Sequence, residues 1–188
     1  MKRTNIVFLL GIYLFLTGCA GTIPPLSFSV PNVGMSSRKI DAEIKSITCT
    51  TARPDESTGE FAPGVGLGTC ELWKASLQEA LDKMLIFTDS SPKKLTLSIK
   101  ILKLEGPPPG ASMTSKTDAK YEITDRSNGD IVFSNVINSE GTTPWDYAFE
   151  GIIRMREAIN RAVQNNILLF LQALETIDLS KPMFPAKK

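Results

Sequence analysis

Apolar and polar residues alternate along several stretches of the chain, and this period of two is typical of strands with one buried face. The clearest stretches are 38–50, 95–104, 117–124 and 131–137. A shorter alternation at 26–30 leaves room for one more strand at the edge of the sheet. The sequence therefore predicts a sheet of four to five strands.

In the first two of these stretches the apolar residues change phase, after Lys45 and around Lys103. A shift of one residue moves the apolar side chains to the other face of a strand. We therefore expect a β-bulge at each of the two places.

A turn signal, Ser127-Asn128-Gly129, separates the last two stretches and predicts a hairpin. A two-residue loop would place Ile123 opposite Ser134. A three-residue loop, with Gly129 in the left-handed conformation, would place Ile123 opposite Phe133. The second register keeps the apolar residues on one face, so it is the one we expect.

Two further stretches have the apolar spacing of amphipathic helices. The first begins near Thr69, a suitable N-cap residue, and ends before Pro92. The second begins at Thr143-Pro144-Trp145-Asp146, with a cap, a proline at the first position and an early acid. It is expected to run to about residue 177, with a kink at Gly151. Its apolar stripe comprises Trp145, Phe149, Ile152, Ile159, Val163, Ile167, Phe170, Leu174 and Ile177.

The resulting order, β-α-β-β-β-α, predicts an α+β fold: a mostly antiparallel sheet of four to five strands with two helices packed on one face. A single domain is expected over residues 38–178. A tether at 19–37 precedes it, and a mobile tail at 179–188 follows it.

The N-terminal segment has a basic start, Lys2-Arg3, followed by an apolar run at 6–16. This run is too short to cross a bilayer, which takes about 20 residues, so it indicates a secretory signal peptide. Its ending, Leu16-Thr17-Gly18-Cys19, resembles the lipobox of bacterial lipoproteins. The resemblance implies removal of residues 1–18 and lipidation of Cys19. Because Ala20 rather than Asp follows the cysteine, it also implies an outer-membrane location facing the periplasm. An ordinary signal peptide, with a cysteine destined for a disulfide, is the alternative.

The composition of the chain limits the kinds of binding and catalysis that it can support. The chain of 188 residues has no histidine, and its formal net charge of +1 becomes −1 when Lys2 and Arg3 are removed. A near-neutral domain has no electrostatic footprint for nucleic acid. The lack of histidine removes the commonest general base and the commonest metal ligand.

Two cysteines remain besides Cys19. Cys49 and Cys70 flank a glycine-rich and proline-rich loop, and a disulfide between them would stabilise the fold by about 3 kcal/mol. Two buried free thiols are the alternative.

No catalytic set emerges from the sequence. Ser-x-x-Lys occurs at 36–39 and 90–93, but both sites lead into strands and lack the companion motifs of the penicillin-binding family. The carboxylates at Asp118 and Glu122 fall on the polar face of a strand, where solvation explains them. We therefore predict no catalytic residue, no metal and no cofactor.

The last helix carries more apolar surface than one sheet contact needs, which suggests that another chain segment or a partner covers Leu168 or Leu169. Arg154 and Arg161, seven residues apart, share one helix face and could meet lipid phosphates or acidic groups of a partner; a solvated face is the alternative. The loop at 106–110, with three consecutive prolines, is either a stiff connection or a docking segment.

By element order the domain resembles small periplasmic lipoproteins that assist envelope assembly or lipid transport, such as the lipopolysaccharide-assembly lipoprotein and the auxiliary lipoproteins of ABC-type lipid transporters. The first hypothesis is a lipid-anchored accessory protein that binds an envelope protein or a lipid without catalysis. The alternatives are an envelope enzyme acting on glycan or lipid through carboxylates or a lysine, and a purely structural surface lipoprotein.

Overall fold

A computed structural model describes residues 23–62, 68–179 and 181–186. The signal segment and Cys19 lie outside these ranges, so the lipobox interpretation stays a prediction. Along the chain the described elements are β1 (Glu43–Thr51), α2 (Thr69–Met84), β2 (Lys94–Leu104), β3 (Met113–Asp125), β4 (Ile131–Thr143) and α3 (Gly151–Leu174). Within the described ranges, no helix is long and apolar enough to span a bilayer.

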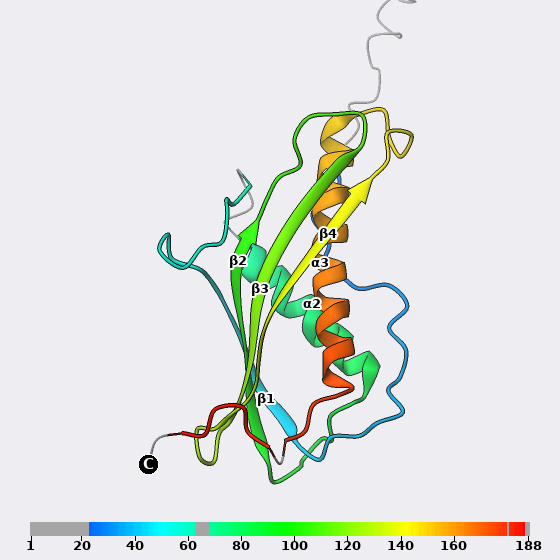
Figure 1. The fold of residues 1–188 in the computed structure, drawn as a ribbon. Coiled ribbons are helices and arrows are strands. Elements are labelled where there is room, and N and C mark those ends of the chain that lie inside the picture. Colours follow the sequence, from blue (N-terminus) through cyan, green and yellow to red (C-terminus); the bar gives the residue numbers. More distant parts are fainter. Residues whose placement is uncertain (1–22, 63–67, 180, 187–188) are drawn as a thin grey trace, which may run out of the picture.

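The four strands form one sheet in the order β1-β2-β3-β4. β1 runs parallel to β2, and the other two pairs are antiparallel. The parallel pair arises because α2 carries the chain back between β1 and β2, as a crossover must. Both helices cover the same face of the sheet (Figure 1). The predicted α+β class and element order are confirmed, whereas residues 26–30 form no strand.

Strand register follows the sequence pattern closely. Both predicted bulges are present, between Ile44 and Ser46 in β1 and between Ile101 and Lys103 in β2. In the hairpin, Ile123 pairs with Phe133, and Gly129 at the turn has a φ of 80°. The predicted three-residue register is therefore confirmed.

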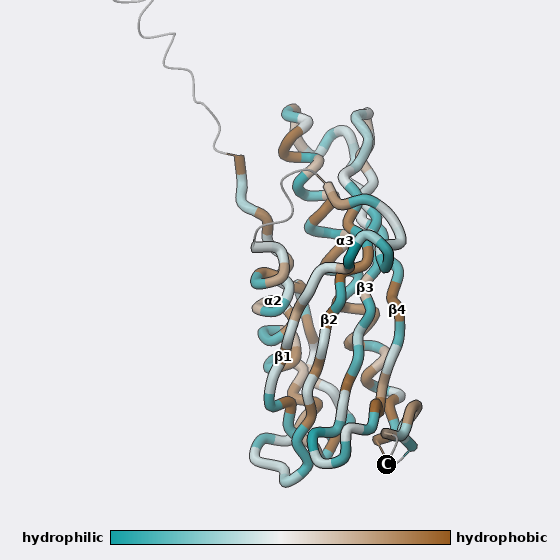
Figure 2. The backbone as a smooth tube through the Cα atoms, turned by 90° about the vertical axis from the view of Figure 1, so that its left-hand side faces the viewer, coloured by the Kyte–Doolittle hydropathy of each residue, from teal (hydrophilic) through white to brown (hydrophobic). Residues whose placement is uncertain are grey.

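The core lies between the inner face of the sheet and the two helices, and apolar residues recur along both layers (Figure 2). Tyr121 of β3 stacks on Phe170 of α3, with ring centroids 4.2 Å apart. Its hydroxyl accepts a hydrogen bond from Trp73 Nε1 and donates one to Asn166 Oδ1, each at 3.0 Å. Burial raises the pKa of Tyr121 well above its usual range. This chain of bonds therefore joins α2, β3 and α3 through neutral groups.

A disulfide between Cys49 and Cys70 joins β1 to the first turn of α2, with Cα atoms 5.4 Å apart. The predicted pairing is confirmed. It ties the edge strand of the sheet to the helix that follows it in the chain.

The start of the last helix differs from the prediction. Residues 144–150 form a loop, and α3 begins at Gly151 and ends at Leu174 rather than near residue 177. The cap signal at Thr143 is overridden because β4 continues to that residue, paired with Met113. Trp145 and Phe149, expected in the buried stripe, are 68% and 100% exposed.

The segment expected as a tether packs against the domain from about Leu26 onward. Phe28 and Val30 are buried, and Phe28 lies edge-on to Trp73 at 6.1 Å between ring centroids. The backbone N–H of Ser27 donates to the Oδ1 atom of Asn160 in α3 at 3.0 Å. The folded unit therefore begins before residue 38.

The C-terminal segment also differs from the expected mobile tail. Phe184 forms an antiparallel bridge with Ile131 at the start of β4. Ala186 donates its backbone N–H to a carboxylate oxygen of Asp130 at 2.7 Å. Residues 183–186 thus lie along the outer edge of the sheet.

Candidate functional site

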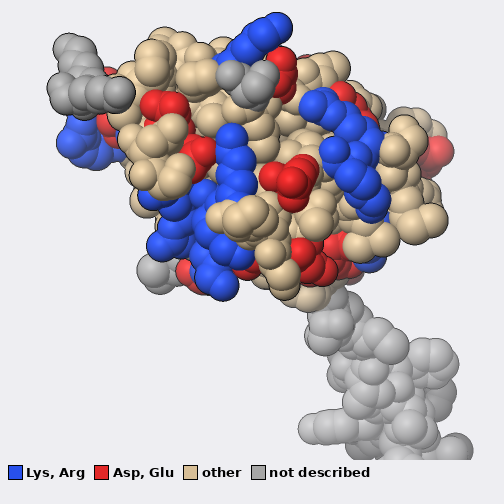
Figure 3. All heavy atoms as spheres, turned by 90° about the horizontal axis from the view of Figure 1, so that it is seen from below, with Lys and Arg blue, Asp and Glu red and all other residues tan. Residues whose placement is uncertain are grey.

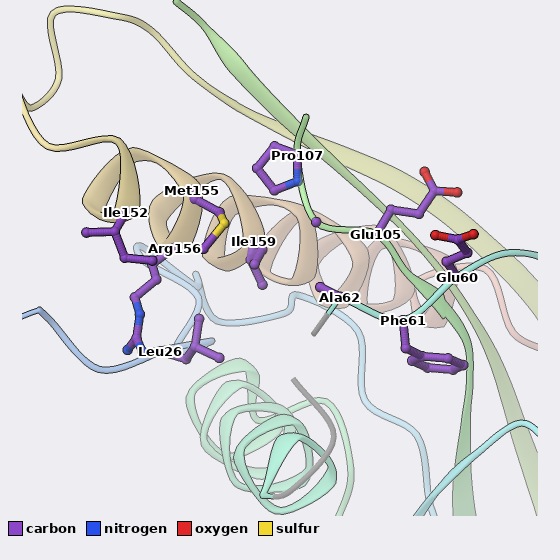
Figure 4. A pocket seen from close by; sticks show the side chains of 11 residues that line it. Leu26, Glu60, Phe61, Ala62, Glu105, Pro107, Ile152, Met155, Arg156 and Ile159 are labelled. Atoms are coloured by element: carbon purple, nitrogen blue, oxygen red, sulfur yellow. The ribbon is translucent and has the colours of Figure 1, made fainter. Parts of the chain in front are cut away.

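A pocket of about 530 Å³ lies at the end of the sheet where α3 begins, called here the upper end (Figure 4). Its apolar side chains come from separate segments. Ile152, Met155 and Ile159 project from the first turns of α3, and Leu26 projects from the N-terminal segment. Pro107, which follows β2, also lines the pocket.

The spacing of the helix residues explains why they share this pocket. Ile152, Met155 and Ile159 are three and four residues apart, so they fall on one helix face. Residues 151–157 are all only half-buried, whereas the next three are buried. The apolar face of α3 therefore continues past the tightly packed core and forms the wall of an open pocket.

Charged groups stand at opposite edges of this pocket. Glu60 and Glu105 lie together at one edge, and Arg156 lies at the other (Figure 4). The Arg156 guanidinium donates to the carbonyl of Pro24 at 2.8 Å, which ties the N-terminal segment to α3. An apolar interior with a few polar groups at the edges is typical of a small-molecule site.

The carboxylates with displaced pKa values lie outside the pocket. Hydrogen bonds from neighbouring lysines hold the pKa of three carboxylates below the usual range: Glu43, Glu56 and Glu79, bonded to Lys94, Lys100 and Lys83. Burial by itself would raise the pKa of Asp125, but bonds from Ser127 and Lys93 outweigh it and the net shift is downward. These are structural ion pairs. The described residues contain no cluster of three or more potential metal ligands.

Asp118 is a buried carboxylate that the sequence pattern assigned to solvent. It accepts a hydrogen bond from the Thr58 hydroxyl at 2.7 Å and lies 3.3 Å from Lys103 Nζ. The loop after β1 covers it, next to the bulge at Lys103. Strand alternation alone carries no signal of this cover, because the loop is distant in sequence.

The two arginines predicted on one face of α3 both bond within the molecule. Arg154 donates to the carbonyls of Ala148 and Phe149 at 2.6 and 2.9 Å. Arg161 donates to the carbonyl of Thr142 at 2.8 Å, and its guanidinium lies 5.2 Å from the ring centre of Tyr147. Both side chains hold the loop at 144–150 in place.

Leu168 and Leu169 lie further along α3 and do not line the pocket. They are 39% and 41% exposed, so the described chain leaves both partly open. Their role as a partner surface stays a prediction.

The exposed aromatic residues of the loop at 144–150 were missed by sequence reasoning. Trp145, Tyr147 and Phe149 are 68%, 48% and 100% exposed. Their spacing matched the stripe of a helix, so the pattern assigned two of them to the core.

Comparison with known proteins gives no family for the chain. No protein-family model matches it, and no curated protein matches its sequence. It is similar in structure to a Xanthomonas campestris protein of the DUF330 family, with a TM-score of 0.46, 12% identity, and coverage of 81% of this chain and 98% of that one. A minor lipoprotein from Acinetobacter baumannii is similar with a TM-score of 0.39 and 8% identity, over 71% of this chain and 92% of that one. A lipoprotein from Neisseria meningitidis is similar with a TM-score of 0.35 and 10% identity, over 69% of this chain and 94% of that one. Bacterial lipoproteins are thus among the structural neighbours, but likenesses this distant carry no argument about function.

Proposed function

We propose that the protein is a lipid-anchored accessory protein of the bacterial cell envelope that binds the acyl part of a lipid and performs no catalysis. Cys19 carries the anchor. By the lipobox resemblance, the domain lies on the outer membrane and faces the periplasm.

The observation that carries this proposal is the open apolar pocket between α3 and the N-terminal segment. Its volume of about 530 Å³ falls within the range of roughly 300–1,000 Å³ that is usual for ligand sites. Burial of each methylene of an acyl chain contributes about 0.8 kcal/mol, so a pocket lined by Leu26, Ile152 and Met155 favours such a ligand.

The position of the pocket supports the same assignment. Leu26, in its wall, is seven residues after the proposed anchor at Cys19. An extended chain spans at most about 3.5 Å per residue, which holds the pocket within about 25 Å of the anchored cysteine. A lipid leaving the membrane surface therefore has a short path to the pocket.

The test is to purify the full-length lipidated protein from envelopes in mild detergent and to identify lipid extracted from it by mass spectrometry. We expect stoichiometric non-covalent lipid in the wild type. Met155→Trp fills the pocket with a larger side chain and should remove that lipid. Leu168→Trp adds similar bulk to the same helix outside the pocket, and it should retain the lipid.

Circular dichroism establishes that each variant is folded, and Leu26→Trp fills the pocket from its opposite side if Met155→Trp unfolds. Equal lipid content in the wild type and in a folded pocket variant contradicts lipid binding at this site.

A second candidate function is binding of an envelope protein through Leu168 and Leu169. Their exposure of about two-fifths each, side by side on α3, favours it. Leu168→Asp with Leu169→Asp should then remove a co-purifying protein without unfolding the domain, while Met155→Trp leaves that protein bound. Retention of the partner by the folded double variant contradicts this candidate.

A further inference from the structure

The loop between β4 and α3 presents three aromatic side chains to solvent at the upper end of the molecule. Phe149 is fully exposed, Trp145 is 68% exposed and Tyr147 is 48% exposed. An aromatic side chain left in water forgoes the burial of roughly 150–250 Å² of surface. Large exposed apolar patches on a folded domain mark a surface that contacts another phase or molecule.

The loop is held in a fixed shape. The Arg154 guanidinium bonds the carbonyls of Ala148 and Phe149, and Arg161 bonds the carbonyl of Thr142 while lying against the ring of Tyr147. A preorganised loop loses little conformational entropy when its side chains are buried by contact with another surface.

The N-terminal segment leaves the domain at this same end. Arg156, one turn into α3, bonds the carbonyl of Pro24, and Arg154 on the same turn bonds the loop. In Figures 1 and 2 the loop and the first described residues of the chain both lie toward the upper end of the long axis. Cys19 precedes Pro24 by five residues, which span at most about 18 Å when extended.

We propose that the loop at 144–150 is a membrane-contact element that inserts its aromatic side chains into the lipid surface holding the anchor. This inference rests on the proposed lipidation of Cys19. Trp and Tyr favour the headgroup region, where their rings are partly buried and their polar atoms stay hydrated. Phe149 enters the boundary of the acyl chains, as apolar residues of interfacial segments do. The short connection to Cys19 favours the membrane over a protein partner or a second copy.

This contact would orient the domain. A single flexible anchor lets a domain rotate freely over the membrane, whereas a second contact fixes one end against it. The pocket is lined by Arg156 and other residues of the first turns of α3, and Arg154 of the same turns bonds the loop. Contact of the loop with the membrane would therefore hold the pocket close to the lipid surface.

The test uses the two tryptophans of the chain, Trp145 and the fully buried Trp73. The full-length lipidated protein is reconstituted into vesicles of phosphatidylethanolamine and phosphatidylglycerol, with or without brominated acyl chains, which quench tryptophan by contact. We expect the emission of Trp145 to shift to the blue on reconstitution. In brominated vesicles, most of the intensity of that emission should be lost. Trp145→Phe should abolish both changes, because Trp73 is shielded by the core.

A matched control places a tryptophan at the other end of the molecule. Phe184 is 57% exposed and lies against Ile131, at the turn end of the β4 hairpin. Phe184→Trp, made in the Trp145→Phe protein, should show no quenching. Equal quenching at both positions overturns the proposed orientation.

Flotation of the vesicles separates the two proposals. If the protein floats but Trp145 is not quenched, the anchor stands and the loop inference is wrong. If the protein does not float and Cys19 carries no lipid by mass spectrometry, the anchor is wrong and the inference falls with it. A blue shift that depends on protein concentration in detergent, without lipid, assigns the loop to contact between copies and also overturns the inference.

Discussion

The two ends of the sheet expose different kinds of side chain to solvent. The upper end exposes Trp145 and Phe149 and holds the apolar pocket. The lower end comprises the turn at 126–130, the ends of both helices and residues 181–186. Seen from below, it carries lysine and arginine side chains interleaved with acidic ones (Figure 3).

Both ends nevertheless use basic side chains to bind backbone carbonyls. At the lower end, Arg38 donates to the carbonyls of Leu174, Glu175 and Ile177, and Lys39 donates to that of Leu85. These carbonyls end α3 and α2, where the helix dipole favours a cation. At the upper end, Arg154 donates hydrogen bonds to carbonyls of the loop at 144–150.

The difference lies in what remains exposed. After its carbonyls are bonded, the lower end presents charged groups that water solvates well, together with the ring of Phe184, which is 57% exposed. The upper end presents aromatic rings, whose exposure contributes nothing to folding. The comparison indicates that the lower end is organised for stability and the upper end for contact with another surface.

The largest expected effect is at Gly141, where β4 approaches α3. A Cβ atom there would lie 2.2 Å from the backbone nitrogen of Ala162 and 2.6 Å from the carbonyl oxygen of Ala158. Helix backbone cannot move aside cheaply, so Gly141→Ala should lower the free energy of unfolding by about 3 kcal/mol or more. Urea unfolding followed by circular dichroism measures this. Gly34→Ala, where a Cβ atom meets nothing within 4 Å, is the control and should leave the midpoint unchanged.

A second prediction compares the two arginines directly. Arg38→Gln should reduce global stability by about 2 kcal/mol, because it removes charged hydrogen bonds to the end of α3. Arg154→Gln should change global stability much less and mainly increase amide exchange in residues 144–150. Urea unfolding and hydrogen exchange of both variants measure the difference. Equal global losses would contradict the proposed division between the two ends.

A smaller effect is expected at Asp125, at the lower end. Its pKa is lowered in the folded protein by bonds from Ser127 and Lys93, which outweigh burial. A carboxyl group with a lowered folded pKa contributes stability above its unfolded pKa, near 3.8, and loses it as the pH falls through the folded value. Thermal unfolding of the wild type and Asp125→Asn should therefore differ at pH 6, and the difference should shrink as the pH falls below 3.8. A constant difference across this range contradicts the assignment.

The smallest effect on stability is expected in the aromatic loop. Trp145→Ser with Phe149→Ser should change the free energy of unfolding by no more than about 0.5 kcal/mol, since exposed side chains contribute little to folding. Urea unfolding of the full-length protein measures this. A decrease of about 3 kcal/mol in the free energy of unfolding would place these rings in the core and remove the basis for a membrane contact.

Short-range patterns predicted much of the fold. The hairpin register, with Ile123 opposite Phe133, followed from the turn at Gly129 and the need to keep apolar residues on one face. The bulge near Lys103 followed from one shift of phase. The start of the last helix was wrong because a local cap signal at Thr143 competed with pairing to Met113, which is thirty residues away.

The candidate site was largely invisible in the sequence. Ile152 and Ile159 were recognised as part of an apolar stripe, but Met155 was not included in it. Nothing in the sequence indicated that the stripe remains half-open at its beginning. The cover of Asp118 by Thr58 and the bond between Arg156 and Pro24 join residues distant in the chain.

By itself, the sequence determined the elements whose signals repeat locally: the alternating strands, the body of each helix, the turn, the cysteine pair and the order that defines the α+β class. Only the tertiary structure decided where β4 ends, that residues 183–186 lie along its edge, and which side chains stay exposed at the upper end. The physical reason is that periodicity records which face of an element is apolar. How completely that face is covered depends on segments brought together from far along the chain.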